Sequence, residues 1–440
     1  AINNFDLYEY ADEAQTVLLN HQSCSKFFSV CVFFLHSAMS FSKATLDLAF
    51  EDKTCNSLHP WNEKCFGSLW DFFKSSVIGT SQFYNLYFLV QLYLNRKRLS
   101  KGYIKSMLKD LVRSTTFGVV MANTFLSFSC LQWNIFGKLH YYSFLLSATL
   151  GGLGIFFEAR QRRGLAINTF INMFLELWVN VLRGTGVLTK SRKVEGLFFM
   201  ISSAVFMYCL RTDKTIKENG GPHVWFYTPP PYPYVQKGIE KLNNNEEVVR
   251  VCPHQGNCSD DILDTGAKYF TIGLCLQILR IVFQNFSKIF KSPQMVFKLL
   301  FRMKNTYFGL FLSMYLITYK AISCFLCHYQ GADSPLHSIL AGFVAGWAYF
   351  IQPNLTILLA IISNLLMNSG RHFRKAYHLP DWPYGELFLA LSNGILYHFR
   401  IFHGQYCPSF LIHMIDSCTQ GKSAAMYKRF TEIMTKYTIT

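Results

Sequence analysis

The sequence has few charged residues and lacks the motifs by which common enzymes are recognised. Charged residues make up 15% of the 440 residues, and Asp and Glu number 26 against 42 Lys and Arg. There is no P-loop, no HExxH, no GxSxG and no dinucleotide-binding fingerprint. Because the few carboxylates lie mostly in loops, no paired acid and base is evident. We therefore predict a non-enzymatic protein without cofactors, and we assign no catalytic, cofactor-binding or metal-binding residues.

Apolar residues are abundant instead. The chain is 51% hydrophobic and 17% aromatic, and its mean hydropathy is positive, a combination that soluble globular proteins of this length rarely show. The formal net charge of +16 comes from short Lys and Arg clusters between apolar segments, which is typical of topogenic or lipid-facing charge. We expect membrane lipids as partners and no nucleic acid.

Ten apolar segments follow one another along the chain in two series of five. The first series covers residues 72–94, 111–133, 141–157, 165–182 and 194–210, and the second covers 267–288, 305–327, 336–352, 354–370 and 385–400. Most approach the roughly 17 to 25 residues that a helix needs to cross a membrane. The predicted fold is all-α and multi-pass, with two homologous halves of four to five membrane segments each.

The two series share their spacing as well as their number. Gly151 and Gly342 lie 191 residues apart, and so do Glu195 and Glu386. Such repeats are common in transporters, whose sites lie between the halves. Duplication can equally produce a larger scaffold that transports nothing, and the sequence leaves both interpretations open.

The repeats divide the chain into five regions. They are an unassigned segment at 1–54, a first membrane repeat at 55–213, a polar Pro-rich linker at 214–250, a second membrane repeat at 251–405 and a C-terminal tail at 406–440. Two basic loops are expected to face the cytosol: one holds Arg96, Lys97, Arg98, Lys101, Lys105 and Lys109, and the other holds Lys288, Lys291, Lys298 and Arg302. An even number of crossings per half is then required, and we expect the fourth segment of each half to lie in the interface or to re-enter.

Polar residues inside the apolar segments are candidates for an intramembrane site. Asn168, Asn172, Glu176 and Asn180 recur every four residues and share one helical face, and Asn364 and Asn368 occupy similar places in the second half. This stripe could line a polar path between the halves or form the wet face of an interfacial helix. Lys320 could pair with a carboxylate or extend its amine to the interface.

Small residues gather in the third segment of each half. The predicted packing residues are Ala148, Gly151, Gly152 and Gly154 in the first half, and Ala341, Gly342, Ala345 and Gly346 in the second. Small residues spaced in this way allow helix backbones to approach closely.

Cysteine and histidine precede the first segment of each half. The two motifs are Cys55, His59 and Cys65, and Cys252, His254 and Cys258. Paired placement suggests a disulfide or a metal clip, although neither motif has the CxxC spacing of a typical zinc site, and we predict a structural role. Other cysteines in apolar stretches, including Cys130 and Cys324, are interpreted as small hydrophobic residues.

Several short stretches carry a resemblance to a known family. They are 158–164 (EARQRRG), 252–258 (CPHQGNC), 319–326 (YKAISCFL), 336–346 (LHSILAGFVAG), and Pro408-Ser409 followed by Gly421-Lys422. In order and spacing, from about residue 55 to the C-terminus, they resemble the transmembrane protein 135 family, also described as peroxisomal membrane protein 52. The chain is also distantly similar to the inner-membrane translocase and small peroxisomal membrane protein group.

The resemblance implies a multi-pass membrane protein of peroxisomes, mitochondria or both. It implies a role in mitochondrial division, peroxisome organisation and lipid handling, with organelle-division or peroxisome-biogenesis proteins as partners. The family supplies no catalytic residues to transfer to this chain. The alternative function is a transporter or a pore that conducts lipid, sterol or a metabolite through the two repeats.

Overall fold

A computed structural model describes residues 43–51, 53–94, 100–212, 229, 252–254, 256–284, 303–378 and 380–438. All regular structure in these residues is helical, as the sequence predicted. The basic stretches at 96–98 and 288–302, most of the segment 1–54 and all of the linker 214–250 except Pro229 lie outside the described residues.

Helices coincide with all ten predicted segments. In the first series they are α3 (Cys65–Leu94), α4 (Lys101–Phe136), α5 (Ser143–Gly152) with η3 (Leu153–Phe157), α6 (Arg160–Gly184) and α7 (Arg192–Thr212). In the second series they are α9 (Cys258–Gln284), η5 (Met303–Asn305) with α12 (Thr306–Gln330), α13 (His337–Ala345) with η6 (Gly346–Phe350), α14 (Leu355–Ala376) and α15 (Tyr384–Phe402). The remaining helices are α2 (Lys43–Phe50), η1 (Cys55–Ser57), η7 (Gly404–Tyr406), α16 (Ser409–Cys418) and α17 (Lys422–Thr438).

Four of the described helices are long and apolar enough to cross a membrane. They are α4, α6, α7 and the continuous helix of η5 and α12. Segments of this length can satisfy every backbone polar group internally while immersed in hydrocarbon. The chain is therefore an all-helical protein with several candidate membrane spans.

The fourth segment of the first half, which we expect to lie in the interface or to re-enter, is also long enough to cross. Helix α6 has 25 residues and sufficient hydropathy to cross, whereas the third segment is the shorter element, covering Ser143–Phe157. Helix α5 ends at Gly151 and Gly152, and the chain tightens there into the 3-10 turn η3. Counting apolar residues did not reveal this change of helix type, because both helix types can carry the same apolar composition.

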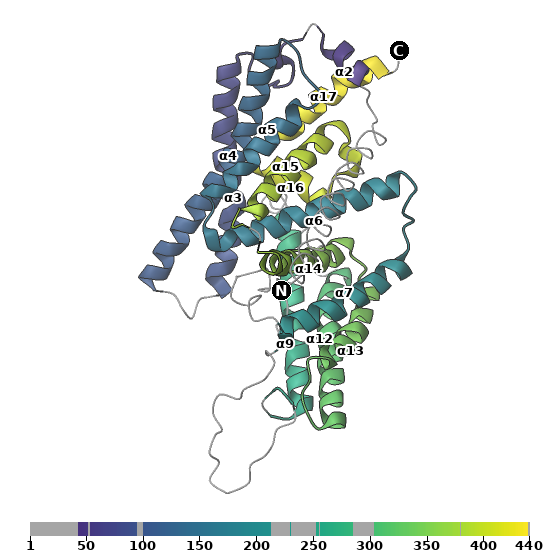
Figure 1. Cartoon of the computed structure of the whole chain (residues 1–440). Helices are drawn as coiled ribbons and strands as arrows, with labels where there is room; N and C mark the ends of the chain where they lie inside the picture. The colour runs from purple at the N-terminus through teal and green to yellow at the C-terminus, as the bar shows by residue number, and fades with distance from the viewer. Residues whose placement is uncertain are drawn as a thin grey trace, which may run out of the picture.

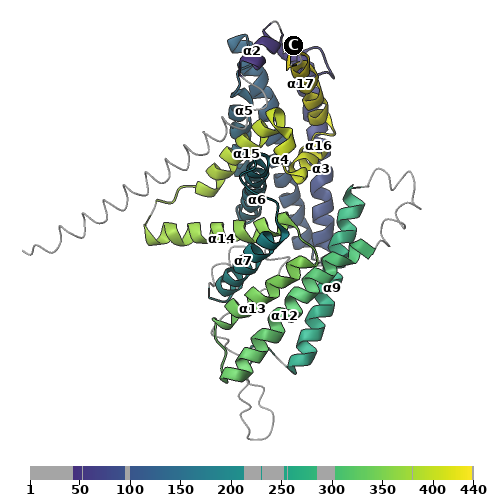
Figure 2. The same cartoon turned by 90° about the vertical axis from the view of Figure 1, so that its right-hand side faces the viewer.

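The helices form two lobes stacked along the long axis of the molecule (Figure 1). We define the first lobe as α2, α3, α4, α5, η3, α15, α16 and α17, and the second lobe as α7, α9, α12, α13 and η6. Helices α6 and α14 lie between the lobes and contact each other. In Figure 1, α6 runs across the view and α14 is seen end-on; Figure 2 shows α14 from the side.

The last helix of each series packs on the lobe built mainly from the other series. Helix α15, from the second series, contacts α5 and η3 in the first lobe, and α7, from the first series, contacts α13 and η6 in the second lobe. Each lobe has its own apolar core, with Phe125, Phe144 and Phe402 in the first and Phe199, Phe311 and Tyr349 in the second. Each core therefore requires side chains from both series.

Helices α15 and α7 each approach a glycine closely. A Cβ atom at Gly152 in the first lobe would lie 2.5 Å from the Cα of Ala390 in α15, and a Cβ at Gly346 in the second lobe would lie 2.6 Å from the Cα of Met200 in α7. Contacts this short to backbone atoms leave no room for a side chain. Glycine is therefore required sterically where α15 and α7 pack on these positions.

The C-terminal region predicted as a tail is helical and packs on the first lobe. Helix α16 contacts α3, and α17 contacts α2 and α16. Phe430 of α17 stacks on Phe50 of α2 with ring centroids 5.6 Å apart, and both side chains are buried. Burial of two aromatic side chains fixes the two ends of the described chain to the same lobe.

Candidate cysteine and histidine clusters and buried ion pairs

The first Cys/His motif meets a fourth residue, Cys130 of α4. Cys55 belongs to η1, His59 to the following loop, and Cys65 is the first residue of α3. The ligand atoms of these four residues all lie within 4.8 Å of one another. Cys65 Sγ lies 3.6 Å from His59 Nε2 and 2.8 Å from Cys55 Sγ. We call these four residues the first cluster.

The second motif meets Cys324 of α12 in the same way. Cys258 is the first residue of α9, and its Sγ lies 3.8 Å from Cys252 Sγ and 3.3 Å from His254 Nε2. Cys324 Sγ also lies 3.3 Å from His254 Nε2. We call Cys252, His254, Cys258 and Cys324 the second cluster, and its ligand atoms all lie within 4.8 Å of one another.

The fourth member of each cluster was missed in the sequence. Cys130 and Cys324 were interpreted as small hydrophobic residues, and both are indeed buried in apolar helices. The spacing of the cysteines is nearly the same in both series, since Cys130 follows Cys65 by 65 residues and Cys324 follows Cys258 by 66. Comparison of cysteine positions between the two series would have found both.

The two clusters are electrostatically alike. Burial is the main cause that raises the pKa of the Cys55 thiol to about 12 and that of Cys252 to about 11, with a further contribution from the neighbouring Cys65 and Cys258. Without a cation these thiols therefore remain protonated at neutral pH. Three sulfurs and one imidazole nitrogen are a donor set that zinc accepts in structural sites.

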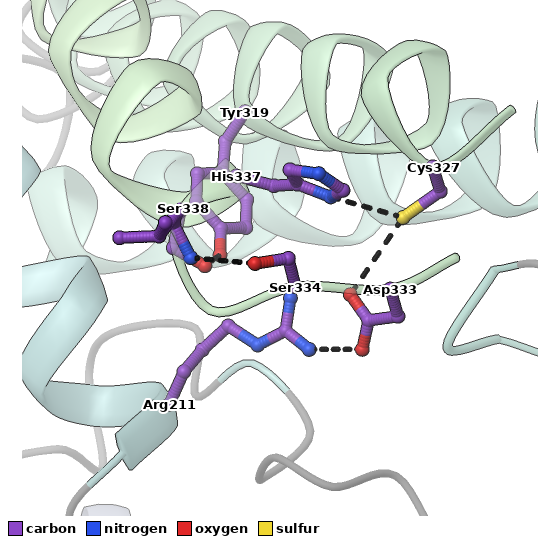
Figure 3. Close-up of polar contacts among 8 residues, drawn as sticks. Arg211, Tyr319, Cys327, Asp333, Ser334, His337 and Ser338 are labelled. Atoms are coloured by element: carbon purple, nitrogen blue, oxygen red, sulfur yellow. Dashed lines mark hydrogen bonds and ion pairs between the residues drawn. The ribbon is translucent and has the colours of Figure 1, made fainter. Parts of the chain in front are cut away.

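A third group consists of Cys327 at the C-terminal end of α12, Asp333 in the following loop and His337 at the start of α13 (Figure 3). Cys327 Sγ is 3.6 Å from both Asp333 Oδ1 and His337 Nδ1. Asp333 also forms an ion pair with Arg211 of α7, whose side chain is 1% exposed. Because that carboxylate is already neutralised by a guanidinium, this group fits an ion pair better than a metal ion.

Lys320 pairs with a carboxylate, which was one of its two sequence interpretations. Its Nζ lies 2.6 Å from Asp261 Oδ2 and 2.7 Å from Thr265 Oγ1, both on α9. A pocket adjoins this pair, and its lining includes Arg211, His254 and Cys324. The ion pair and the second cluster therefore belong to one polar region of the second lobe.

The polar stripe of α6 lies partly against α14. Thr356 Oγ1 donates a hydrogen bond to Glu176 Oε2 at 3.2 Å, and Asn172 Nδ2 donates to the Thr356 carbonyl at 3.4 Å. Asn180 Nδ2 donates to the Tyr406 carbonyl at 3.0 Å. The stripe therefore joins α6 to two other segments of the chain.

The remaining asparagines of the intramembrane set do not join this contact. Asn364 Nδ2 donates to the Ala360 carbonyl of its own helix at 2.7 Å. Asn168 and Asn368 are buried, and their Oδ1 atoms accept no hydrogen bond from the described residues. The structure thus does not bring the seven predicted intramembrane residues, Lys320 included, into one site.

The predicted packing residues all lie at close contacts. Ala148, Ala341 and Ala345 are fully buried. A Cβ atom at Gly151 would lie 2.6 Å from the Met121 carbonyl oxygen, and one at Gly342 would lie 2.9 Å from the Ser203 carbonyl oxygen. The contact at Gly154 is looser, at 3.2 Å from Val120 Cγ1.

Helix α6 also carries an arginine near each end, and each arginine pairs with a carboxylate of α15 or α7. Arg163 Nη1 lies 3.4 Å from Glu386 Oε1 at the start of α15, and Arg183 pairs with Glu195 at the start of α7. Tyr349 Oη donates a second hydrogen bond to Glu195, at 3.0 Å. Carboxylates are favourable at helix N-termini, so both pairs reinforce the docking of α7 and α15.

The first cluster lies within a region that matches a known family. Residues 53–182 match the family model of the N-terminal cysteine-rich region of Transmembrane protein 135. This region includes Cys55, His59, Cys65 and Cys130. No solved structure shows a significant match to the chain. Residues 53–182 therefore carry the cysteine-rich region that is characteristic of the transmembrane protein 135 family, as the resemblance predicted.

Proposed function

We propose that this chain is a non-enzymatic, multi-pass organelle membrane protein that regulates mitochondrial division and peroxisome organisation and has a role in lipid metabolism. The observation that carries the proposal is the match of residues 53–182 to the transmembrane protein 135 family, in a chain with several helices able to cross a membrane. We propose membrane lipids and proteins of organelle division or peroxisome biogenesis as its partners.

Ion pairs between different segments of the chain support a scaffold role. Arg163, Arg183 and Lys320 each pair with a carboxylate from another helix, and Arg211 pairs with Asp333 in the loop between α12 and α13. An acid or base in catalysis needs a titratable group that can exchange its proton with a substrate. Carboxylates that pair with arginine or lysine across helix contacts are better suited to hold helices together.

Localisation and organelle shape test the proposal. A fluorescently tagged chain is expected at peroxisomes, mitochondria or both, and its deletion is expected to change mitochondrial length or peroxisome number. Re-expression of the full chain should restore both measurements. A protein found at the plasma membrane alone, or a deletion with unchanged organelles, would contradict this function.

We also propose that the two helix series are structural repeats that have exchanged their last helices. The support is the matched set of contacts: α4 with α5 and α12 with α13, α3 with α4 and α9 with α12, α15 with α5 and α7 with α13. An exchanged element that completes a neighbour's core is the geometry of domain swapping. Within one chain, the two exchanged helices would hold the two halves together through their packing contacts.

Cleavage of the linker tests the exchange. A protease site inserted within residues 214–250 and cut after purification in detergent should leave both fragments in one complex, because each core contains a helix from the other series. Size-exclusion chromatography measures this directly. Separation of the fragments under conditions that keep the uncut chain monodisperse would show that the exchanged contacts do not hold the halves together.

A second function, transport of a polar or amphipathic solute, is favoured by the pocket beside Lys320. The pocket is lined by charged groups on α7, α9 and α12, and ionisable groups within membrane helices often mark substrate paths. Liposomes that contain the purified chain and a fluorescent lipid would test it. A lipid flux that exceeds the flux in empty liposomes and that falls in Lys320→Ala would support transport. A flux equal to that of empty liposomes would reject transport of that solute.

A further inference from the structure

We propose that each of the two Cys/His clusters binds one Zn²⁺ ion through three cysteine sulfurs and one histidine nitrogen. The first site consists of Cys55, His59, Cys65 and Cys130, and the second of Cys252, His254, Cys258 and Cys324. The chain would therefore carry two structural zinc centres, one in each lobe.

The donor set matches zinc more closely than the other common biological cations. Calcium and magnesium prefer oxygen ligands, and neither cluster includes a carboxylate. A closed tetrahedral site with three cysteines and one histidine is typical of structural zinc. Four protein donors leave no open position for a substrate, so these centres would stabilise the fold.

The distances in the second cluster approach those of a tetrahedral site. Zn–S bonds of about 2.3 Å place two sulfurs about 3.8 Å apart, and a nitrogen ligand about 3.5 Å from each sulfur. Cys252 and Cys258 have sulfurs 3.8 Å apart, and His254 Nε2 lies 3.3 Å from the sulfurs of Cys258 and Cys324. These three distances differ from the tetrahedral spacing by a few tenths of an ångström at most, and the remaining donor pairs lie within 4.8 Å.

The first cluster has a suitably oriented imidazole. His59 Nδ1 lies 3.1 Å from the Asn62 carbonyl oxygen and can donate its proton there. Nε2, which lies 3.6 Å from Cys65 Sγ, then carries the free lone pair. Backbone carbonyls commonly orient metal-ligating histidines in this way. The Cys55 and Cys65 sulfurs, 2.8 Å apart, would separate by about 1 Å to reach the tetrahedral spacing.

Both centres occupy the same position in a helical hairpin. Cys65 and Cys258 are the first residues of α3 and α9, and Cys130 and Cys324 lie near the ends of the antiparallel partners α4 and α12. The residue four positions later on each partner helix also reaches its cluster: Asn134 contacts Cys55, and His328 contacts Cys258. A metal ion at this position would link the N-terminus of the first helix to the C-terminal part of the second, at the end of the hairpin that has no connecting loop.

A disulfide between Cys55 and Cys65 is the competing outcome for the first cluster, and it would remove two of the four ligands. Zinc binding instead releases the thiol protons and leaves the sulfur oxidation state unchanged. The two outcomes therefore differ in metal content and in free thiol content. Both quantities can be measured on the same protein.

The full chain should be purified in detergent without chelator and analysed for zinc by mass spectrometry. We expect about two zinc ions per chain in the native protein. Cys130→Ser and Cys324→Ser should each hold about one, and the double variant close to none. Cys407→Ser is the matched control, because Cys407 is equally buried but lies outside both clusters, and it should keep two.

A second measurement protects the test against variants that fail to fold. X-ray absorption at the zinc edge of the native chain should report three sulfur ligands at about 2.3 Å and one nitrogen at about 2.0 Å. A zinc content near zero, a zinc shell dominated by oxygen, or a Cys55–Cys65 disulfide found by mass spectrometry without reductant would overturn the proposal.

Discussion

Lys320 of α12 and Asp261 of α9 form an ion pair across the hairpin of the second lobe, with 2.6 Å between Nζ and Oδ2. The lysine lies one helical turn before Cys324 of the second cluster. Its side chain is 11% exposed and that of Asp261 is 23% exposed. The pair therefore lies where water screens it only partly, close to the site proposed for zinc.

Asp261→Asn is expected to lower the thermal stability of the chain in detergent. The substitution preserves the size of the side chain but leaves the buried ammonium of Lys320 without its carboxylate. Loss of one partner from a buried pair costs about 3–5 kcal/mol, and partial exposure here reduces our expectation to roughly 1–3 kcal/mol. Tryptophan fluorescence during heating would measure the change.

The double variant Asp261→Leu/Lys320→Met separates pairing from packing. Removal of both charges should restore part of the stability lost in Asp261→Asn, because no unpaired charge remains. Asp264→Asn is the control, since Asp264 lies on the same helix and is exposed, and it should leave the melting temperature unchanged. Equal losses from Asp261→Asn and Asp264→Asn would refute a specific role of the pair.

Asp333→Asn is expected to weaken the attachment of α7 to the second lobe. Asp333 pairs with Arg211, the largest fully buried side chain among the described residues. We expect a loss of roughly 2–4 kcal/mol, because the guanidinium would remain buried with a neutral neighbour. A matched control is Asp381→Asn, whose partner Arg374 lies 3.1 Å away in an exposed pair and whose loss should leave the melting temperature unchanged.

Substitution of Gly152 or Gly346 by alanine should destabilise the chain, because neither position has room for a methyl group. Gly152→Ala and Gly346→Ala each place a Cβ within 2.6 Å of a backbone Cα atom of the exchanged helix, and overpacking of this kind costs about 1–3 kcal/mol. Gly164→Ala in α6 meets no atom within 4 Å and should leave the melting temperature unchanged or raise it, since alanine favours helix. A higher melting temperature for Gly346→Ala than for Gly164→Ala would disprove the close approach.

The positions of the helices could be predicted from the sequence because most of the apolar runs approach the length that a helix needs to cross a membrane. The neighbours against which α7 and α15 pack could not be predicted from the sequence. Apolar periodicity shows which face of a helix is buried but not which neighbour buries it, and the two series present similar apolar patterns to either lobe. Only the structure shows that α15 packs against Gly152 and that α7 packs against Gly346.

The Cys/His motifs were recognised in the sequence, but their fourth members were not. Cys130 and Cys324 lie in apolar helices, where a buried cysteine is usually a small hydrophobic residue. Their partners are 65 and 66 residues away, far beyond the local spacing by which zinc motifs are recognised. Likewise, a carboxylate partner for Lys320 was one of two interpretations, but nothing local pointed to Asp261, which lies 59 residues away.

Loss of one zinc centre should loosen one lobe and leave the other intact. In Cys130→Ser, hydrogen exchange is expected to rise in α3, α4 and the loop that contains His59, because the open end of that hairpin is no longer tied. In Cys324→Ser it should rise in α9 and α12 and also in α7, which belongs to the first series but packs on α13 of the second lobe. Amide exchange followed by mass spectrometry would resolve these segments. If α7 instead followed α3 and α4 in Cys130→Ser, the lobes would be divided by sequence order and the exchanged packing would be wrong.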